Sequence, residues 1–75
     1  MHENSLNKKE RMIFSLLFST KVDFEIDIQN FCRADTRSEF KEEIRIILKK
    51  GGISITEDRI IHRDDAVIWK LTLKR

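Results

Sequence analysis

Hydrophobic residues recur at helical spacing near the start of the chain. Residues three and four positions apart share one face of a helix, and the stripe formed in this way consists of Met12, Ile13, Leu16 and Leu17. Phe14 and Phe18 lie one turn apart on another side of the same helix. Asn7 and Glu10 have the spacing of a capping box. The pattern therefore predicts a helix that follows Asn7 and ends near Thr20.

The next segment, residues 21–35, combines two periods. The alternating residues are Val22, Phe24, Ile26 and Ile28, and the residues at helical spacing are Ile28, Phe31 and Cys32. We reconcile the two periods with a short extended piece at the start, followed by a helix from about residue 24 or 25 to residue 33. Asp23 is placed to cap this helix, because its side chain can accept hydrogen bonds from the first free N–H groups. Ala34 and Asp35 then form a turn.

An amphipathic helix is predicted from Thr36 to Lys50. Its apolar face consists of Phe40, Ile44, Ile47 and Leu48. A row of cations at four-residue spacing runs beside that face and consists of Arg37, Lys41, Arg45 and Lys49. The remaining side carries Glu39, Glu42, Glu43 and Ile46. Asp35 or Thr36 caps the start, with Glu39 completing a capping box, and Gly51 ends the helix in the left-handed conformation of a C-cap.

Alternation with a period of two dominates the last third of the chain. The alternating apolar residues are Ile53 and Ile55 in one run, and Val67, Trp69, Leu71 and Leu73 in the other. The polar residues Arg63, Asp64 and Asp65 predict the tip of a hairpin between the two runs. We assign Trp69 to the core, with a cation–π contact to Arg59 as the alternative.

The order of these elements is α-β-α-α-β-β, which predicts an α+β fold. Residues 7–75 are expected to form one domain, preceded by a flexible N-terminus at residues 1–6. A chain of 75 residues buries only about 60% of its unfolded surface, so its core is small. Two packed layers are feasible at this size, whereas an enzyme with a deep cleft is a poor fit.

From about Val22 to Lys74 the chain resembles the winged-helix superfamily of helix-turn-helix domains. The residues that carry the resemblance are Ile28, Phe31, Cys32, Ala34, Asp35, Thr36, Phe40, Ile44, Ile47, Leu48 and the ending Lys49-Lys50-Gly51-Gly52-Ile53. The loop before Phe40 is about one residue longer than in the common pattern. The resemblance implies a three-helix winged helix-turn-helix domain whose C-terminal β-hairpin is the wing. It also implies a sequence-specific transcriptional regulator, such as a repressor, that binds double-stranded DNA.

In this interpretation the helix over residues 36–50 lies in the major groove and the wing, residues 57–66, touches the backbone or the minor groove. The residues expected at base edges are Thr36, Arg37, Ser38 and Lys41. Those expected at phosphates or in the wing are Arg45, Lys49, Arg59, His62 and Arg63. A single module of this kind buries only a small surface on DNA. A homodimer is therefore expected, with contacts through Phe14, Phe18 and Ile46.

The charge balance keeps an alternative open, because the net charge is only +2 and no global basic field favours nucleic acid. Acidic residues stand among the cations of the wing, and Glu42 flanks the basic row of the helix. The alternative is a winged-helix module that binds a partner protein, as an adaptor or inhibitor, without binding DNA. In that case Ile46 on the acidic side of the helix is expected to meet the partner.

Catalysis and bound metals are not expected. His62-Arg63-Asp64 spells a kinase triplet without the downstream Asn or a glycine-rich loop, and two His and one Cys are too widely spaced for a metal site. No cofactor is predicted. The single cysteine fits a reducing compartment, and no stretch is long enough to cross a membrane. These features predict a cytoplasmic protein, which would lie in the host cytoplasm if its origin is a virus or another mobile element.

Overall fold

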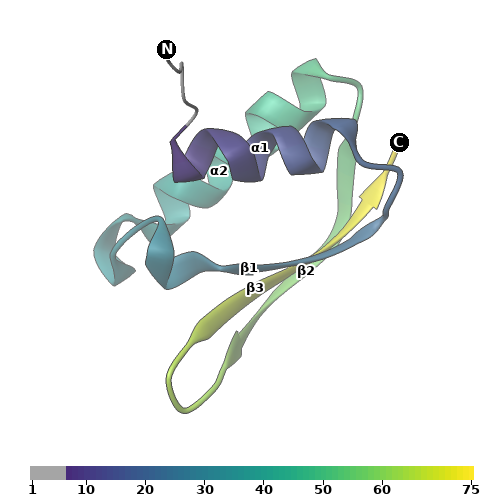
Figure 1. Cartoon of the computed structure of the whole chain (residues 1–75). Helices are drawn as coiled ribbons and strands as arrows, with labels where there is room; N and C mark the ends of the chain where they lie inside the picture. Colours follow the sequence, from purple (N-terminus) through teal and green to yellow (C-terminus); the bar gives the residue numbers. More distant parts are fainter. Residues whose placement is uncertain (1–6) are drawn as a thin grey trace.

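A computed structural model of the chain describes residues 7–75, and the prediction made for residues 1–6 lies outside this range (Figure 1). The elements are α1 (Lys8–Phe18), β1 (Asp23–Asp27), the 3-10 turns η1 (Ile28–Asn30) and η2 (Ala34–Thr36), α2 (Arg37–Lys50), β2 (Ser54–His62) and β3 (Val67–Lys74). The predicted α+β class is confirmed. Among the described residues no helix is both long and apolar enough to cross a membrane.

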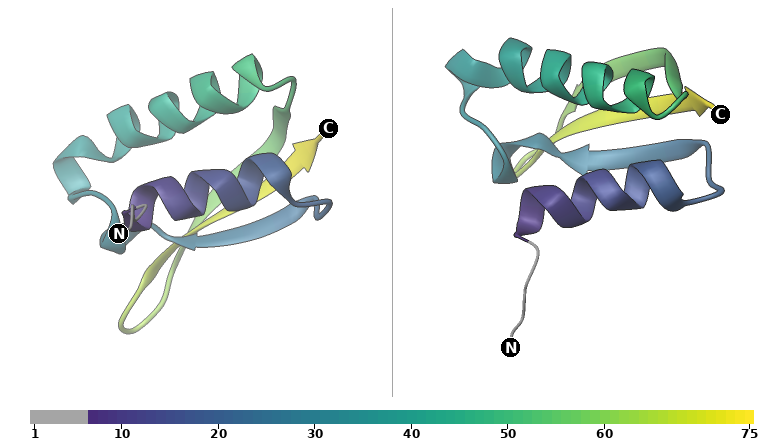
Figure 2. Two further views of the ribbon diagram at one scale, coloured as in Figure 1. Left: turned by 45° about the horizontal axis from the view of Figure 1, so that its top comes forward. Right: turned by 90° about the horizontal axis from the view of Figure 1, so that it is seen from above.

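The three strands form one antiparallel sheet in the order β1-β3-β2. Both helices lie on the same face of this sheet, with α1 toward β1 and α2 toward β2 (Figures 1 and 2). No helix of the described residues covers the other face. The hairpin of β2 and β3 extends beyond the helices at one end of the molecule. The result is a two-layer domain with an open sheet face.

The core lies between the sheet and the two helices. The four inward residues of β3 are buried, as the alternation predicts, and so are the core residues of α2. The fully buried side chains are Trp69, Leu16, Ile28, Ile44, Leu48 and Leu71. Phe40 meets Trp69 edge to face, with ring centroids 6.2 Å apart, and stacks on Phe31 at 5.8 Å. Each large side chain buried in this way contributes roughly 1.5–3 kcal/mol of transfer free energy.

The helix predicted from residue 24 or 25 to 33 is wrong. Residues 23–27 instead form the strand β1, which pairs with β3 and places Ile26 beside Trp69. Only one helical turn follows, in which the Cys32 N–H donates to the Ile28 carbonyl at 3.1 Å. Asp23 caps nothing, because it is a strand residue and accepts a hydrogen bond from the Thr72 hydroxyl at 3.2 Å. The described residues therefore hold two α-helices rather than three.

The helix ends agree with the predictions only in part. The capping box of Asn7 and Glu10 is confirmed, although α1 ends at Phe18 rather than near Thr20. The box expected for Thr36 and Glu39 is wrong, because the Thr36 hydroxyl bonds the backbone of Arg33. Glycine ends α2 as expected, but the residue with positive φ is Gly52, at 81°, and not Gly51.

The turn after α2 is a Schellman motif. The N–H of Ile53 donates to the Leu48 carbonyl at 2.9 Å, and the N–H of Gly52 donates to the Lys49 carbonyl at 3.0 Å. These are the two bonds that define the motif, and both Ile53 and Leu48 are buried. The motif therefore turns the chain sharply from the end of α2 into β2.

The tip of the hairpin falls at Arg63–Ala66, where the Arg63 N–H donates to the Ala66 carbonyl at 2.9 Å. The predicted tip is thus confirmed. In β2 the register shifts between Ile55 and Glu57, which leaves Thr56 as the extra residue of a bulge. Such an insertion exchanges the faces on which the following side chains lie. It places Asp58 on the helix side of the sheet.

Candidate nucleic-acid interface

The charges of α2 separate onto two sides of the helix. The side toward the hairpin, here called the hairpin flank, carries Arg37, Lys41, Arg45 and Lys49. The side toward α1, here called the α1 flank, carries Glu39, Glu43 and Lys50. Two contacts fix this orientation: Arg45 reaches Asp58 of β2, whereas Glu43 reaches Lys9 of α1. The predicted basic row therefore lies on the hairpin flank, and its middle residues, Lys41 and Arg45, contact β2.

Two hydrogen-bond donors and a lysine ammonium group converge on a single carboxylate oxygen at the middle of the hairpin flank. Asp58 Oδ2 accepts a hydrogen bond from Trp69 Nε1 at 2.9 Å and from Arg45 Nη2 at 3.1 Å. Lys41 Nζ lies 3.8 Å from the same oxygen and 5.8 Å from the centroid of the Trp69 ring. Arg45 also has a weaker contact with Glu42, whose Oε1 lies 4.0 Å from Nη1. We call Asp58, Trp69, Lys41 and Arg45 the Asp58 cluster.

The Asp58 cluster lies at the surface, yet it is partly shielded from solvent. The side chains of Lys41, Asp58 and Arg45 are 22%, 24% and 37% exposed. The hydrogen bond from the Trp69 indole lowers the pKa of Asp58, and the charges of Arg45 and Lys41 act in the same direction against the effect of burial. The carboxylate is therefore held in its charged form, as a bound anion would be.

The two ends of the hairpin flank differ from its middle. Arg37 and Lys49 form no ion pair within the described part of the chain, and Lys49 is exposed. The Nε atom of Arg37 is buried without a hydrogen-bond partner among those residues. Arg37 also acts on Cys32: burial raises the pKa of this thiol, and the nearby guanidinium opposes that shift. Cys32 itself donates weakly to the Ile28 carbonyl at 3.6 Å.

The remaining residues expected at the start of α2 lie elsewhere. The hydroxyl of Thr36 is occupied by the backbone of Arg33, with both bonds at 3.2 Å. Ser38 is exposed and borders a shallow depression around Ile46, on the side of the helix that carries the glutamates. The first turn of α2 therefore offers Arg37 and the exposed Ser38 hydroxyl, whereas the Thr36 hydroxyl is already engaged.

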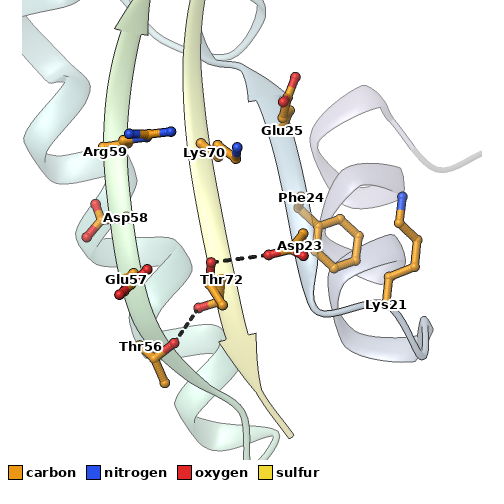
Figure 3. Close-up of a pocket in the computed structure, with 10 residues that line it drawn as sticks. All are labelled: Lys21, Asp23, Phe24, Glu25, Thr56, Glu57, Asp58, Arg59, Lys70 and Thr72. Atoms are coloured by element: carbon orange, nitrogen blue, oxygen red, sulfur yellow. Dashed lines mark hydrogen bonds between the residues drawn. The ribbon is translucent and has the colours of Figure 1, made fainter.

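The predicted wing residues do not share one surface. His62 ends β2 on the helix side of the sheet, in register with Val67. Arg59 lies on the opposite, open face, where Figure 3 shows it beside Lys70, its cross-strand neighbour. Arg63 lies at the tip, 3.9 Å from Glu25. Only His62 therefore belongs to the same side of the sheet as the hairpin flank.

Trp69 is a core residue, as assigned, and the alternative contact with Arg59 is wrong. Trp69 pairs in register with Ile60, and its cation–π partner is Lys41 rather than Arg59. Sequence reasoning also missed the role of Asp58, which it counted only as one acid of the wing. No local signal marks the bulge that turns this side chain toward α2.

The apolar residues expected at a dimer interface lie in two separate places. Phe18 is 78% exposed and touches Phe14, with ring centroids 5.7 Å apart, beside a hollow that also includes Phe24. Ile46 is 47% exposed and lies in the depression bordered by Glu39, Glu42 and Glu43. The three residues expected at a dimer interface therefore lie on two helices and do not form one patch.

The open face of the sheet has a hollow with charges of both signs (Figure 3). Arg59 and Lys70 lie near its centre, and Asp23, Glu25 and Glu57 surround them. Within residues 7–75 no three His, Cys, Asp or Glu side chains gather in a way that could hold a metal ion. The mixed charge makes this face a poorer anion surface than the hairpin flank.

Comparison with protein-family models, with curated proteins and with solved structures gave no significant match to the chain.

Proposed function

We propose that the protein is a sequence-specific regulator of transcription that binds double-stranded DNA through the hairpin flank of α2. The main support for this proposal is the separation of charge on α2, which gathers four cations on the side of the hairpin. A row of cations on one helix edge can follow the phosphates that border a groove. The positive end of the helix dipole adds to the attraction at Arg37.

The parts of the surface are expected to act differently. Arg37 stands in the first turn of α2, where recognition helices usually meet base edges, and a guanidinium can bond guanine through two donors. Ser38, beside it, can bond a base or a phosphate. Arg45 and Lys49 lie further along the helix and would meet phosphates. His62 lies on the helix side of the sheet and would be the wing residue on the side of the hairpin flank, while Arg59 and Arg63 would reach only a backbone that passes the hairpin.

Fluorescence anisotropy with labelled random duplexes tests this function. The double variant Lys41→Gln/Arg45→Gln should lose at least about tenfold in affinity and reduce the dependence on salt, because two phosphate contacts disappear. Lys50→Gln is the matched control, since it removes one cation from the same helix on the α1 flank. Wild-type protein that shows no binding at low salt would rule out the proposed function.

Sequence preference separates a regulator from a general binder. Duplexes selected from a random pool should share a preferred site, and Arg37→Ala should weaken that site by about 1–3 kcal/mol more than other sequences. Lys49→Ala should weaken all sequences alike. Selection that returns the starting pool would reduce the function to non-specific binding.

A homodimer belongs to this proposal, because one small module buries only about 600–1,000 Å² on DNA. Phe14 and Phe18 offer the apolar contact for it on α1. Light scattering should report a dimer at micromolar concentration and a monomer for Phe18→Asp. A selected site with two-fold symmetry would agree with the dimer, whereas a wild-type monomer would exclude it.

The exposed Ile46 favours a second candidate function, which is binding of a partner protein. An apolar side chain bordered by three glutamates suits a surface with a small hydrophobic pocket and a basic rim. In that case Ile46→Asp should abolish capture of the partner, whereas Lys41→Gln/Arg45→Gln should leave it unchanged. Duplex binding that depends on Lys41 and Arg45 would decide in favour of the first candidate.

A further inference from the structure

The Asp58 cluster has the composition of a phosphate site. An ammonium, a guanidinium and a neutral N–H converge on one oxygen, Asp58 Oδ2, at 3.8, 3.1 and 2.9 Å. Arginine and lysine are the usual ligands of phosphate, and both favour a charged oxygen over a neutral one. In the free protein the carboxylate of Asp58 occupies the position that a phosphate oxygen would take.

We propose that the Asp58 cluster is a phosphate-binding subsite of the DNA surface, and that Asp58 is an internal anion which competes with the DNA backbone for Lys41 and Arg45. This inference rests on the proposed function. It adds a residue that lowers affinity: while Asp58 holds the two cations, they are neutralised in part and turned toward β2. A backbone phosphate that takes them over must displace Asp58 or share the cations with it.

The position of the cluster makes such an exchange feasible. The three charged side chains are all partly exposed, so a phosphate can approach without unfolding of the core. Ion pairs at this level of exposure contribute little net free energy, because solvent and salt screen them. The Trp69 indole is fixed in the core, however, and its N–H keeps pointing at the site whichever anion occupies it.

A bulge in β2 creates this arrangement, which is why Asp58 differs from the other acids of the hairpin. The extra residue Thr56 turns Asp58 toward α2, while its neighbours Glu57 and Arg59 lie on the open face (Figure 3). Asp64 and Asp65 lie at the exposed tip and form no ion pair with the described residues. Removal of the charge of Asp58 should therefore affect DNA binding more than removal of an acid at the tip.

The test compares Asp58→Asn with Asp64→Asn, which remove the same charge from the cluster and from the tip. Binding to a labelled random duplex is measured by anisotropy at several salt concentrations. The amide that replaces the carboxylate of Asp58 keeps an oxygen that can accept from Trp69, so the indole is not left without a partner. We expect at least about a tenfold gain in affinity for Asp58→Asn and less than about a threefold gain for Asp64→Asn. The salt slope should steepen by about 1–2 as cations become free.

A second comparison assigns the gain to the two cations. In the background Lys41→Gln/Arg45→Gln, the substitution Asp58→Asn should give no more gain than Asp64→Asn. Emission of Trp69, the single tryptophan, checks that the core is intact in each variant. If Asp58→Asn does not fold, Asp58→Ser replaces it, because a hydroxyl also accepts from the indole.

The outcomes separate this inference from the proposed function. Wild-type binding to duplex with equal effects of Asp58→Asn and Asp64→Asn would overturn the competition and leave the function in place. The same holds for a gain that persists without Lys41 and Arg45. No binding by wild type or by either variant would overturn both.

Discussion

The two flanks of α2 belong to one helix, yet their charges meet very different surroundings. On the hairpin flank two cations share one carboxylate with a buried indole, in a surface site whose charged side chains are 22–37% exposed. On the α1 flank Lys9 and Glu43 form a simple pair, 2.8 Å apart, with side chains 39% and 48% exposed. The neighbouring element, and not the helix itself, therefore decides what a charge on α2 can do.

The difference also bears on function. On the hairpin flank the four cations outnumber the one acid that reaches them from β2, so this edge keeps an excess of positive charge. On the α1 flank Glu39 stays without an ion pair among the described residues, and Glu43 has its own cation. A polyanion that approaches α2 therefore meets attraction on the hairpin flank and no comparable attraction on the α1 flank, where Glu39 and Glu43 offset Lys9 and Lys50.

The largest expected effect comes from removing Trp69, the buried side chain of β3 beneath the Asp58 cluster. Trp69→Ala removes a fully buried side chain that contacts Phe40 and donates to Asp58. It should lower the free energy of unfolding by about 3–5 kcal/mol. Because a domain of this size has a total stability of roughly 4–11 kcal/mol, the variant should lose a large fraction of its stability and unfold at a much lower urea concentration. Urea unfolding followed by circular dichroism measures the change.

Phe18→Ala is the control on α1, because it removes an aromatic ring that is 78% exposed. Its free energy of unfolding should change by less than about 0.5 kcal/mol. A loss for Phe18→Ala as large as that for Trp69→Ala would mean that Phe18 is buried in solution, as in a stable dimer.

The second effect measures how much the Asp58 cluster contributes to the free energy of unfolding. Asp58→Ala leaves the buried Trp69 N–H without an acceptor and brings Lys41 and Arg45 together without a counter-charge. A buried donor left unpaired costs about 1–3 kcal/mol. Asp58→Asn keeps an acceptor and should cost clearly less, as measured by the same urea unfolding. Equal losses for the two substitutions would show that charge, and not the indole hydrogen bond, dominates the stabilising role of Asp58.

Several elements were predictable because their signals are local. The apolar residues of α2 repeat every three or four positions, and those of β3 alternate over the whole strand. Asn7 and Glu10 form a capping box within one turn of helix, and the tip of the hairpin follows from the consecutive polar residues Arg63, Asp64 and Asp65. None of these features needs information from a distant part of the chain.

The segment between the helices could not be assigned in the same way. Ile26 and Ile28 fit both a strand and a helix, and both are buried in the folded protein. The choice between strand and helix depends on β3, which lies about 40 residues further along the chain. Without β1, the backbone N–H and C=O groups along one edge of β3 would have no hydrogen-bond partners in the sheet. The tertiary contact therefore overrides the helical spacing of Phe31 and Cys32.

The cations of the candidate site could be predicted from the sequence, whereas the position of Asp58 could not. The four-residue spacing places Arg37, Lys41, Arg45 and Lys49 on one edge of α2, and Lys41 and Arg45 reach Asp58 of β2 from that edge. The facing of Asp58 depends on the bulge at Thr56, which shifts the alternation of β2 by one residue. Without that bulge Asp58 would lie on the open face, so the Asp58 cluster could not be foreseen.

The third effect is a dependence of stability on pH through Asp58 of the hairpin. The pKa of Asp58 is lowered in the folded protein, so its charged form stabilises the fold. This contribution is complete above the ordinary value of 3.8 and is lost as the pH falls through the lower folded value. Wild-type protein should therefore lose more stability than Asp58→Asn between about pH 5 and pH 2. Thermal unfolding at a series of pH values gives the two curves, and parallel curves would contradict the prediction.

The smallest effect is expected on the α1 flank. Glu43→Gln removes the partner of Lys9, but both side chains are substantially exposed, and Lys9 keeps its position over the Phe40 ring, 5.7 Å from the centroid. Exposed pairs of this kind contribute about 0.2–1 kcal/mol, and salt screens them. Urea unfolding at low and high salt should show a small loss that disappears at about 1 M salt. A loss that persists there would mean that the α1 flank is held by contacts as shielded as those of the Asp58 cluster, and the contrast between the two flanks would then fail.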